Sequence, residues 1–595
     1  MCGIIFAYSH DPKLVDSISD TAALKGIKHR GPDGQRVVRP HSGVLIGHTR
    51  LAIRGVTTGQ QPFIDKKVIT VVNGEIYNYR SLLKESKSIR GDCEVLHLFA
   101  LNKNAEELHE SLGRIQGMFA WLAYYPETNL LFTAIDTFGQ KPLYKYEDQN
   151  ILIYSSEISG IRLLLDEIGI SLLPNPQDYS QYLLHGWMSC EKTGWKNVTY
   201  QNRGTYHWHM LKEGMFQKRS YFSFGSRLKL SSSEEASEFL KNELRRYARA
   251  AFDSEVSVAL GLSSGLDSSY IGCLAKDCTE QDIHAISLGY DLVHDGDEAN
   301  AAHMFASGIN LKCRRIQAST DHFVGDYLTT TALMQEPVVD FASQFYSKIY
   351  KSAALDCGFK VILMGHGADE ISIGYGWMHK ALNIALKRSS FCLYEVLDDF
   401  RIYYRSLKQF SSLQADIYPE IDFKSSLKNK EEYAINLVSA VCDSWLQCSS
   451  LKMADRLSMG HGIECRSPLL NEVLMTELGS LYRLLPNSMD CQKGLYKIAY
   501  STKIDQAMLE AEKKYFSPPR LPLYNRLRTF MRNKYSSNQS VAEDLGIIRA
   551  GTMNYLLNHA SDSCTYYWFN KIMRLELSLL HSLDPVSFQI LLEQA

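Results

Sequence analysis

The pattern of apolar and polar residues divides the chain into three parts. In residues 2–210, short strand-like runs alternate with turn residues, as expected for a domain of stacked β-sheets. In residues 230–520, strand-like and helix-like segments alternate, which predicts a parallel sheet with helices on both faces. Residues 521–595 carry only amphipathic helical patterns such as 566–580, and such stripes are typical of a core or a subunit contact. We place the first boundary within residues 203–231, where turn residues and mixed charges gather.

The sharpest local pattern lies in residues 256–276. An apolar run up to Leu260 is followed by a Gly/Ser loop and then, from Tyr270, by apolar residues at helical spacing, which predicts strand, loop and helix. In that geometry the loop amides and the helix N-terminus favour a phosphate or pyrophosphate. The glycines let the backbone come close, the serines supply hydroxyl groups, and Asp267 is placed to hold Mg²⁺.

Three interpretations of this loop are open from its residues alone. The first is an ordinary strand-to-helix turn that binds nothing. The second is the G-x-S-x-G elbow of hydrolases, which the run from Gly261 to Gly265 fits and which would make Ser263 a nucleophile. The third is the S-x-G-x-D-S pyrophosphate loop of ATP enzymes that adenylate a substrate, which this segment closely resembles. A Walker phosphate loop is excluded, because G-x-x-x-x-G-K-[ST] does not occur in the sequence.

Composition limits the class of protein. The chain has 595 residues, of which 45% are hydrophobic and 22% charged, as in a globular protein of two or three domains. The formal charge of −2 gives no electrostatic argument for a nucleic-acid or membrane partner. The 13 cysteines form no short disulfide framework and suit reduced thiols, so we expect a cytoplasmic location. We find neither a signal peptide nor a run that could span a bilayer.

Cys2 is the first candidate for chemistry. If Met1 is removed, the mature chain begins with a thiol and a free α-amine on the same residue. An α-amine has a pKa of about 7.7 to 8.0, so it can act as general base for its own side chain. Taken alone, Cys2 is more simply explained as the start of a strand.

Four motifs behind Cys2 change that interpretation. They are HRGPDG at 29–34, GHTRLAI at 47–53, VVNGEIYNY at 71–79 and GDCE at 91–94. In this order they resemble the N-terminal-nucleophile (Ntn) glutaminase domain of class II amidotransferases, which implies an αββα sandwich over residues 2–210. Further segments extend the likeness, and we interpret most of their side chains as structural: 117–121, 136–144 and 154–158.

This resemblance implies glutamine as the amide donor. Attack of the cysteine thiolate on a carboxamide creates an oxyanion, for which the family uses the side chain of Asn73 and the amide of Gly74. Arg50 is placed to bind the α-carboxylate of glutamine as a bidentate cation. Asp92, with Glu75 as a second contact, is the implied partner of the α-ammonium group.

Segments of the second part resemble the glutamine-hydrolysing asparagine synthetases, and the likeness covers roughly residues 2–520. They lie at 361–376, 454–470, 493–497 and 513–518, and the last two are basic. The resemblance implies a doubly wound parallel-sheet PP-loop domain, of the adenine nucleotide alpha hydrolase-like type, that uses ATP and Mg²⁺. The implied ligands of nucleotide, pyrophosphate and metal are Leu262, Ser263, Gly265, Asp267, Ser268, Leu288, Gly365, Asp369 and Lys493.

Two further acidic pairs have no assigned role. They are Asp297 with Glu298, and Glu336 with Asp340. Solvated loops and a contribution to the second site explain them equally well.

The family's reaction joins the two halves. Ammonia released from glutamine passes internally to the second site, where ATP converts an acceptor carboxylate into an acyl adenylate that ammonia attacks. Aspartate is the family's acceptor. Here His366 stands in place of a glutamate that is expected to accept a proton from ammonia, Met364 replaces a serine, and Ser264 replaces a glycine. Histidine can take a proton near neutral pH but cannot present a permanent carboxylate.

We therefore predict amidation of aspartate or a related carboxylate, with His366 at the catalytic position. One alternative is a carboxylate acceptor in a natural-product or polysaccharide pathway. β-Lactam synthetases, which share the fold, also replace the glutamate, but they lack a working N-terminal cysteine. The other alternative is a glutamine-binding regulatory protein with a degenerate second half. The sequence does not set the oligomeric state, and a homodimer is compatible with it.

Overall fold

A computed structural model describes residues 2–595 apart from 84–88, 226–227, 293–294, 388–389, 393–409, 414–419, 423–428, 512–517, 535–539 and 560–562. The basic segment expected at 513–518 lies outside the described residues, except for Pro518. No helix in the described part of the chain is long and apolar enough to cross a membrane.

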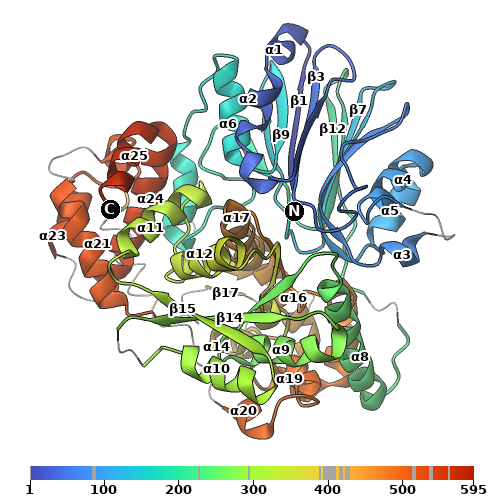
Figure 1. Cartoon of the computed structure of the whole chain (residues 1–595), viewed down its shortest axis with the longest axis vertical. Coiled ribbons are helices and arrows are strands. Elements are labelled where there is room, and N and C mark those ends of the chain that lie inside the picture. Colours follow the sequence, from blue (N-terminus) through green and yellow to red (C-terminus); the bar gives the residue numbers. More distant parts are fainter. Residues whose placement is uncertain are drawn as a thin grey trace.

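The N-terminal half is a sandwich of two six-stranded antiparallel sheets (Figure 1). The first sheet has the spatial order β10 (Val198–Tyr200), β8 (Tyr144–Glu147), β9 (Ile151–Ser155), β1 (Cys2–Ser9), β3 (Val44–Arg50) and β2 (Gly34–Val38). The second has the order β12 (Met215–Ser220), β11 (Thr205–Met210), β7 (Leu130–Ile135), β6 (Gly117–Tyr125), β5 (Ile69–Ile76) and β4 (Phe63–Ile64).

One apolar layer lies between these sheets and a helical layer covers each outer face. Alternate residues of β1, such as Ile4 and Phe6, meet the inner face of β5 and β6, while Ile5 and Ala7 point to the other side. The helices α2 (Asp20–Lys25) and α6 (Ile158–Glu167) cover the first sheet, and α4 (Glu94–Asn102) and α5 (Ala105–Leu112) cover the second. The predicted αββα sandwich is confirmed, and its last strand, β12, ends at Ser220.

The second half is built on a five-stranded sheet. Its order is β15 (Lys312–Ala318), β14 (His284–Tyr290), β13 (Val258–Gly261), β16 (Val361–Leu363) and β19 (Glu464–Arg466). Every neighbouring pair is parallel. The order reverses direction at β13, so the carboxyl end of this strand lies at the switch point where α/β proteins bind ligands.

Helices pack on both faces of this parallel sheet, as predicted. Val258 and Leu260 contribute to a core with α8 (Ser233–Phe252), α9 (Leu266–Cys278) and α18 (Glu472–Leu484). Ala259 between them faces the opposite core, with α11 (Phe323–Met334), α12 (Ser343–Lys351) and α17 (Lys452–Gly460). The two-residue period of the strand therefore supplies both cores.

The C-terminal helices pack into the second of these cores. The aromatic and leucine stripe of α24 (Ser563–Leu583) is buried against α11, which agrees with the core interpretation. Arg574 donates to Tyr327 O and Thr331 Oγ1 on α11. Contacts with the sandwich half also occur, because Tyr182 Oη donates to Lys571 O at 2.6 Å.

The described part of the chain has further elements, of which some pack into these cores and two, β17 and β18, form a separate two-stranded sheet. In chain order they are α1 (Pro12–Asp16), η1 (Lys28–Arg30), α3 (Tyr79–Leu82), η2 (Pro176–Asp178), α7 (Tyr179–His185), α10 (Ala299–Gly308), η3 (Ser352–Asp356), α13 (Ala368–Ile371), α14 (Gly376–Ala385), β17 (Ser390–Cys392), β18 (Glu420–Asp422), α16 (Lys430–Val441), η5 (Cys442–Leu451), η6 (Pro486–Met489), α19 (Gly494–Tyr500), α20 (Gln506–Glu510), α21 (Arg520–Lys534), α22 (Val541–Asp544), α23 (Thr552–His559) and α25 (Pro585–Glu593).

Candidate active sites

Cys2 begins β1 at the junction of the two halves, where Figure 1 marks the N-terminus. Its main-chain N–H donates to Asn73 Oδ1 at 3.0 Å. The other end of that amide, Asn73 Nδ2, is buried and has no hydrogen-bond partner in the described part of the chain. A fixed and buried N–H donor of this kind is suited to stabilising an oxyanion.

The backbone at Gly74 can be formed only by glycine. Its φ is +157°, and a Cβ atom there would lie 2.0 Å from the Met118 carbonyl oxygen. The close approach arises because β5 and β6 pair through Gly74 and Phe119. Gly74 therefore brings the main chain beside the thiol without a side chain in the way.

Four of the five predicted glutamine ligands line the same small pocket as Cys2, and Asn73 is not among the residues that line it. Arg50, Gly74, Glu75 and Asp92 all line it. The Arg50 guanidinium donates to the carbonyl oxygens of residues 54, 55 and 56, so it also holds the loop that forms one wall. Asp92 Oδ2 accepts the Ile76 N–H at 2.7 Å.

Electrostatics in this pocket are dominated by burial. Burial raises the pKa of the Cys2 thiol, while the Leu51 amide and the Arg50 guanidinium act in the opposite direction. Burial and the neighbouring Asp92 raise the pKa of Glu75, whose Oε2 lies 2.9 Å from Arg54 Nε and 3.3 Å from an Arg466 Nη atom. A thiol that is protonated at rest needs a base close by before it can attack.

The second site is a cavity of about 560 Å³ at the carboxyl ends of the parallel strands. Its floor is the loop from Gly261 to Ser268, which joins β13 to α9 as the sequence predicted. Helix α9 begins at Leu266 with no side-chain cap, so its first amides are available to an anion. The predicted residues Leu262, Ser263, Gly265, Asp267, Ser268, Leu288, Gly365, Asp369 and Lys493 all line this cavity.

The two loop serines hold the loop in shape. Ser263 Oγ lies 3.0 Å from Ser268 Oγ and accepts the Gly265 N–H at 3.1 Å. No hydrogen bond among the described residues joins Ser263 to a histidine or a carboxylate, which a hydrolytic nucleophile needs for activation. This geometry argues against the hydrolase interpretation.

Lys493 lies between two carboxylates of the cavity. Its Nζ is 2.5 Å from Asp267 Oδ2 and 3.3 Å from Asp369 Oδ1. Both neighbours act to raise the pKa of Lys493 against its burial, so it stays a cation. Its φ of +57° is unusual for a residue with a side chain, and such conformations concentrate at functional sites.

Asp267 and Asp369 fit a magnesium ion as a partial ligand set. Carboxylate oxygens suit Mg²⁺, which usually takes only one or two from the protein and completes its shell with phosphate and water. No cluster of three or more metal-binding side chains occurs among the described residues, so these two carboxylates need the phosphates of a nucleotide to hold the ion.

His366 lines the cavity in a neutral form. Burial lowers its pKa to about 4, and its Nε2 atom is occluded and has no hydrogen-bond partner among the described residues. Its ring lies 5.9 Å from that of Tyr346. His366 therefore lines the cavity as a neutral imidazole whose Nε2 atom is occluded and not engaged in a hydrogen bond among the described residues.

The acidic pairs left open by the sequence take different places. Glu298 and Asp340 line the cavity. Asp297 instead binds Arg315 and Ala299 N. Glu336 lies away from the cavity, between Tyr144 and Lys452 at the junction of the halves.

Sequence reasoning did not identify several residues of this site. Trp445 lines the cavity and donates through Nε1 to Glu370 Oε1 at 3.2 Å, and Tyr500 Oη donates to Asp267 Oδ1 at 2.9 Å. Tyr346 and Gln492 also line it. In the sequence, these residues stand out only as aromatic or amide side chains in a helix-rich region, which does not mark them as part of a site.

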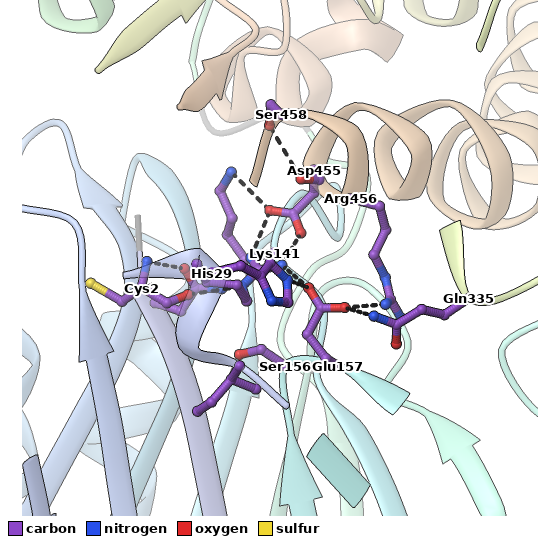
Figure 2. A network of polar contacts seen from close by, with 12 residues as sticks. Cys2, His29, Lys141, Ser156, Glu157, Gln335, Asp455, Arg456 and Ser458 are labelled. Carbon is purple, nitrogen blue, oxygen red and sulfur yellow. Dashed lines mark hydrogen bonds and ion pairs between the residues drawn. The ribbon is translucent and has the colours of Figure 1, made fainter. Parts of the chain in front are cut away.

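A buried ion cluster connects the Cys2 strand to the second half (Figure 2). Arg30 donates through Nε to the Cys2 carbonyl at 3.0 Å and binds both Glu157 and Asp455. Glu157 also accepts from Arg456 of α17, and Asp455 lies 3.5 Å from Lys141. These side chains are fully buried, so Lys141 and Glu157, which we interpreted as structural, form part of the junction.

Comparison with known proteins supports the assignment of both halves of the chain. The family model for asparagine synthase matches residues 240–592, and the model for a glutamine amidotransferase domain matches residues 1–222. The chain is 24% identical to asparagine synthetase [glutamine-hydrolyzing] 3 of Bacillus subtilis, with 96% of both chains covered. It is 23% identical to asparagine synthetase [glutamine-hydrolyzing] 1 of the same organism, with 94% of both covered. It is also 24% identical to the amidase chry2 of Gibberella zeae, over 63% of this chain and 59% of that protein. The chain therefore belongs to the asparagine synthase family and carries an N-terminal glutamine amidotransferase domain.

Proposed function

We propose that this chain is a glutamine- and ATP-dependent amidotransferase that forms asparagine from aspartate. The observation that carries the proposal is the pairing, in one chain, of the Cys2 pocket with a PP-loop cavity that contains Lys493. The full-length likeness to relatives named as glutamine-hydrolysing asparagine synthetases supports aspartate as the acceptor.

In the first half-reaction, the Cys2 thiolate attacks the carboxamide carbon of glutamine. Asn73 Nδ2 and the Gly74 amide donate to the oxyanion that forms, and a free α-amine on Cys2 takes the thiol proton. Ammonia leaves as the thioester forms, and water then releases glutamate. Arg50 and Asp92 hold the charged groups of the substrate.

In the second half-reaction, an oxygen of the acceptor carboxylate attacks the α-phosphorus of ATP and pyrophosphate leaves. The loop amides, the first turn of α9 and Lys493 hold the negative charge that moves onto pyrophosphate. Mg²⁺ held by Asp267 and Asp369 would neutralise phosphate charge. Ammonia then attacks the acyl carbon, AMP leaves, and His366 is the group placed to take the extra proton.

A second acceptor class follows from His366. His366 is a neutral imidazole in the cavity lining, at the position where the resemblance implies a glutamate, and the amidase relative extends the likeness beyond proteins named as asparagine synthetases. A related carboxylic acid is therefore the alternative acceptor.

Pyrophosphate release tests the proposal. The full chain is given ATP, Mg²⁺ and glutamine with a panel of carboxylic acids headed by aspartate, and the same panel is repeated with ammonium chloride. Release with aspartate and formation of asparagine are the expected result. Turnover with another acid alone assigns the second acceptor class. ATP binding without pyrophosphate release for every acid contradicts the proposal and favours a regulatory protein.

A further inference from the structure

Two buried cysteines from different halves of the chain lie against each other. Cys190 follows α7 in the sandwich half, and Cys448 lies on η5 in the second half. Their Sγ atoms are 3.4 Å apart, and both residues are buried. Because a disulfide bond is about 2.05 Å long, the two atoms need to approach by little more than an ångström.

The surroundings of the pair distinguish the two thiols. The hydrogen bond between them lowers the pKa of Cys448 and raises that of Cys190. The Lys452 ammonium, one helical turn beyond Cys448, also favours the thiolate of Cys448. The thiolate is the form that reacts with peroxides and disulfides, so Cys448 is the attacking member.

The segment that carries Cys448 forms one wall of the synthetase cavity. Trp445 and Ser450 of the same π-helical element, η5, line this cavity. Gln447 of η5 also binds the sandwich half, through Arg203 N and Gln201 O. A covalent bond at Cys448 therefore acts on an element that has both the cavity and the junction as neighbours.

The segment that carries Cys190 supports the same cavity from the sandwich side. Trp187 packs edge-on against Trp445, with ring centroids 5.3 Å apart. Gly186 O accepts the Val339 N–H at 2.7 Å, and the next residue, Asp340, lines the cavity. Residues 186–190 thus contact two walls of the site from outside.

We propose that Cys190 and Cys448 form a reversible disulfide under peroxide, and that this bond slows turnover in the synthetase cavity by fixing η5 against residues 186–190. The Cys448 thiolate attacks one oxygen of hydrogen peroxide, which gives a sulfenic acid and a hydroxide that takes a proton to become water. Cys190 then attacks the sulfenyl sulfur, and the second oxygen leaves as water. The two thiols lose two electrons in total, which reduce the peroxide, and a dithiol restores them.

The bond is tested by treating the full chain with hydrogen peroxide and mapping its peptides without reduction. We expect a linked peptide pair containing Cys190 and Cys448, which disappears after dithiothreitol treatment. Pyrophosphate release is measured with ammonium as nitrogen source, so that oxidation of Cys2 does not enter the result. We expect it to fall about tenfold on oxidation, since small displacements of a reacting group cost this much or more, and to recover with dithiothreitol.

Cys190→Ala is the test variant and Cys313→Ser, at a partly buried thiol on β15, is the matched control. The first is expected to keep its activity under peroxide, and the control to lose it as the natural chain does. The peptide map of the natural chain shows whether the disulfide forms, even if Cys190→Ala folds poorly. Absence of the linked peptide, or a linked chain with full activity, overturns the proposal.

The activity readout rests on the proposed function, whereas the peptide map does not. If the reduced chain releases no pyrophosphate with any acid, the proposed function fails independently of the disulfide. ATP affinity of the reduced and oxidised chain then decides the effect on the cavity: a weaker affinity after oxidation supports the inference, and an unchanged affinity overturns it.

Discussion

Asn73 and Cys2 are joined through one end of the asparagine amide: Asn73 Oδ1 accepts the Cys2 N–H at 3.0 Å. This bond fixes the amide and leaves Nδ2 as the end that has no partner in the described part of the chain. The orientation of a potential oxyanion donor is thus set by the residue that carries the nucleophile. Substitutions at Asn73 can therefore distinguish two roles of this side chain: Oδ1 holds the Cys2 strand in place, and Nδ2 stabilises the oxyanion.

Asn73→Asp keeps an oxygen for the Cys2 amide but removes the Nδ2 donor. We expect glutamine hydrolysis to fall about 10² to 10³-fold, the usual effect of removing one oxyanion donor. Ammonia-dependent pyrophosphate release should stay unchanged, because the second cavity does not contain Asn73. Asn73→Ala, which loses both interactions, is the comparison. Full glutaminase activity in Asn73→Asp would mean that Nδ2 is not the donor.

The sequence predicts the elements that local pattern controls. The run from Val258 to Gly261 and the helix from Leu266 follow from a change of period within some twenty residues, and the structure has both. The structure also brings together residues from separate motifs: Arg50, Gly74 and Asp92 line one pocket with Cys2, and the loop at 261–268 lines the other with Lys493. The strand, loop and helix at 258–278 could be predicted because the residues of that segment set its local shape.

Contacts between distant segments could not be predicted in this way. Glu157 and Arg456 pair across 299 positions, and nothing in either segment marks the other as its partner. Trp445 lies on a π-helical element, where the wider turn breaks the 3.6-residue period from which a buried face is inferred. The side chains that complete the cavity and the junction are therefore visible only in the fold.

Lys493→Ala tests the cation of the cavity. The substitution removes the charge that holds pyrophosphate and leaves Asp267 and Asp369 facing each other. We expect ammonia-dependent pyrophosphate release to fall at least about 10²-fold, in line with the loss of one preorganised charge in a dry site. Glutaminase activity should persist, which also shows that the variant folds. Lys497→Ala, another cavity lysine with no carboxylate partner in the ion pairs described, should have a smaller effect, and equal losses would contradict a specific role for Lys493.

Glu157→Gln tests the buried junction through stability and its pH dependence. Arg456 and Arg30 hold the pKa of Glu157 well below the ordinary glutamate value, against burial that would raise it. A depressed pKa contributes stability that is present above the ordinary value, about 4.3, and is lost as the pH falls toward the folded value. We expect the variant to be less stable by about 3–5 kcal/mol near neutral pH, as for one partner removed from a buried pair.

The difference between the natural chain and Glu157→Gln should shrink as the pH falls below about 4.3, because the unfolded chain then takes up a proton at Glu157 while the folded chain stays ionised. Denaturant unfolding between pH 3 and 7 measures it, with the exposed Glu127→Gln as control. A difference that is constant with pH would show that the carboxylate charge is not what stabilises the junction.

The pH dependence of amide formation tests whether His366 takes the proton from ammonia after the acyl adenylate has formed. Since burial lowers its pKa to about 4, His366 is a neutral base throughout pH 6 to 9 and loses that role only as the pH falls toward 4. At constant free ammonia, we therefore expect that titration of His366 causes no change in the rate of amide formation above about pH 5.

His366→Gln keeps a polar side chain of similar size but has no basic nitrogen. In this variant, exchange of labelled pyrophosphate into ATP with the acceptor should persist, while amide formation falls about 10² to 10⁴-fold, the usual range for a lost general base. Equal loss of both reactions would assign His366 to acceptor binding, and a step near pH 6.5 in the natural chain would place the imidazole in water.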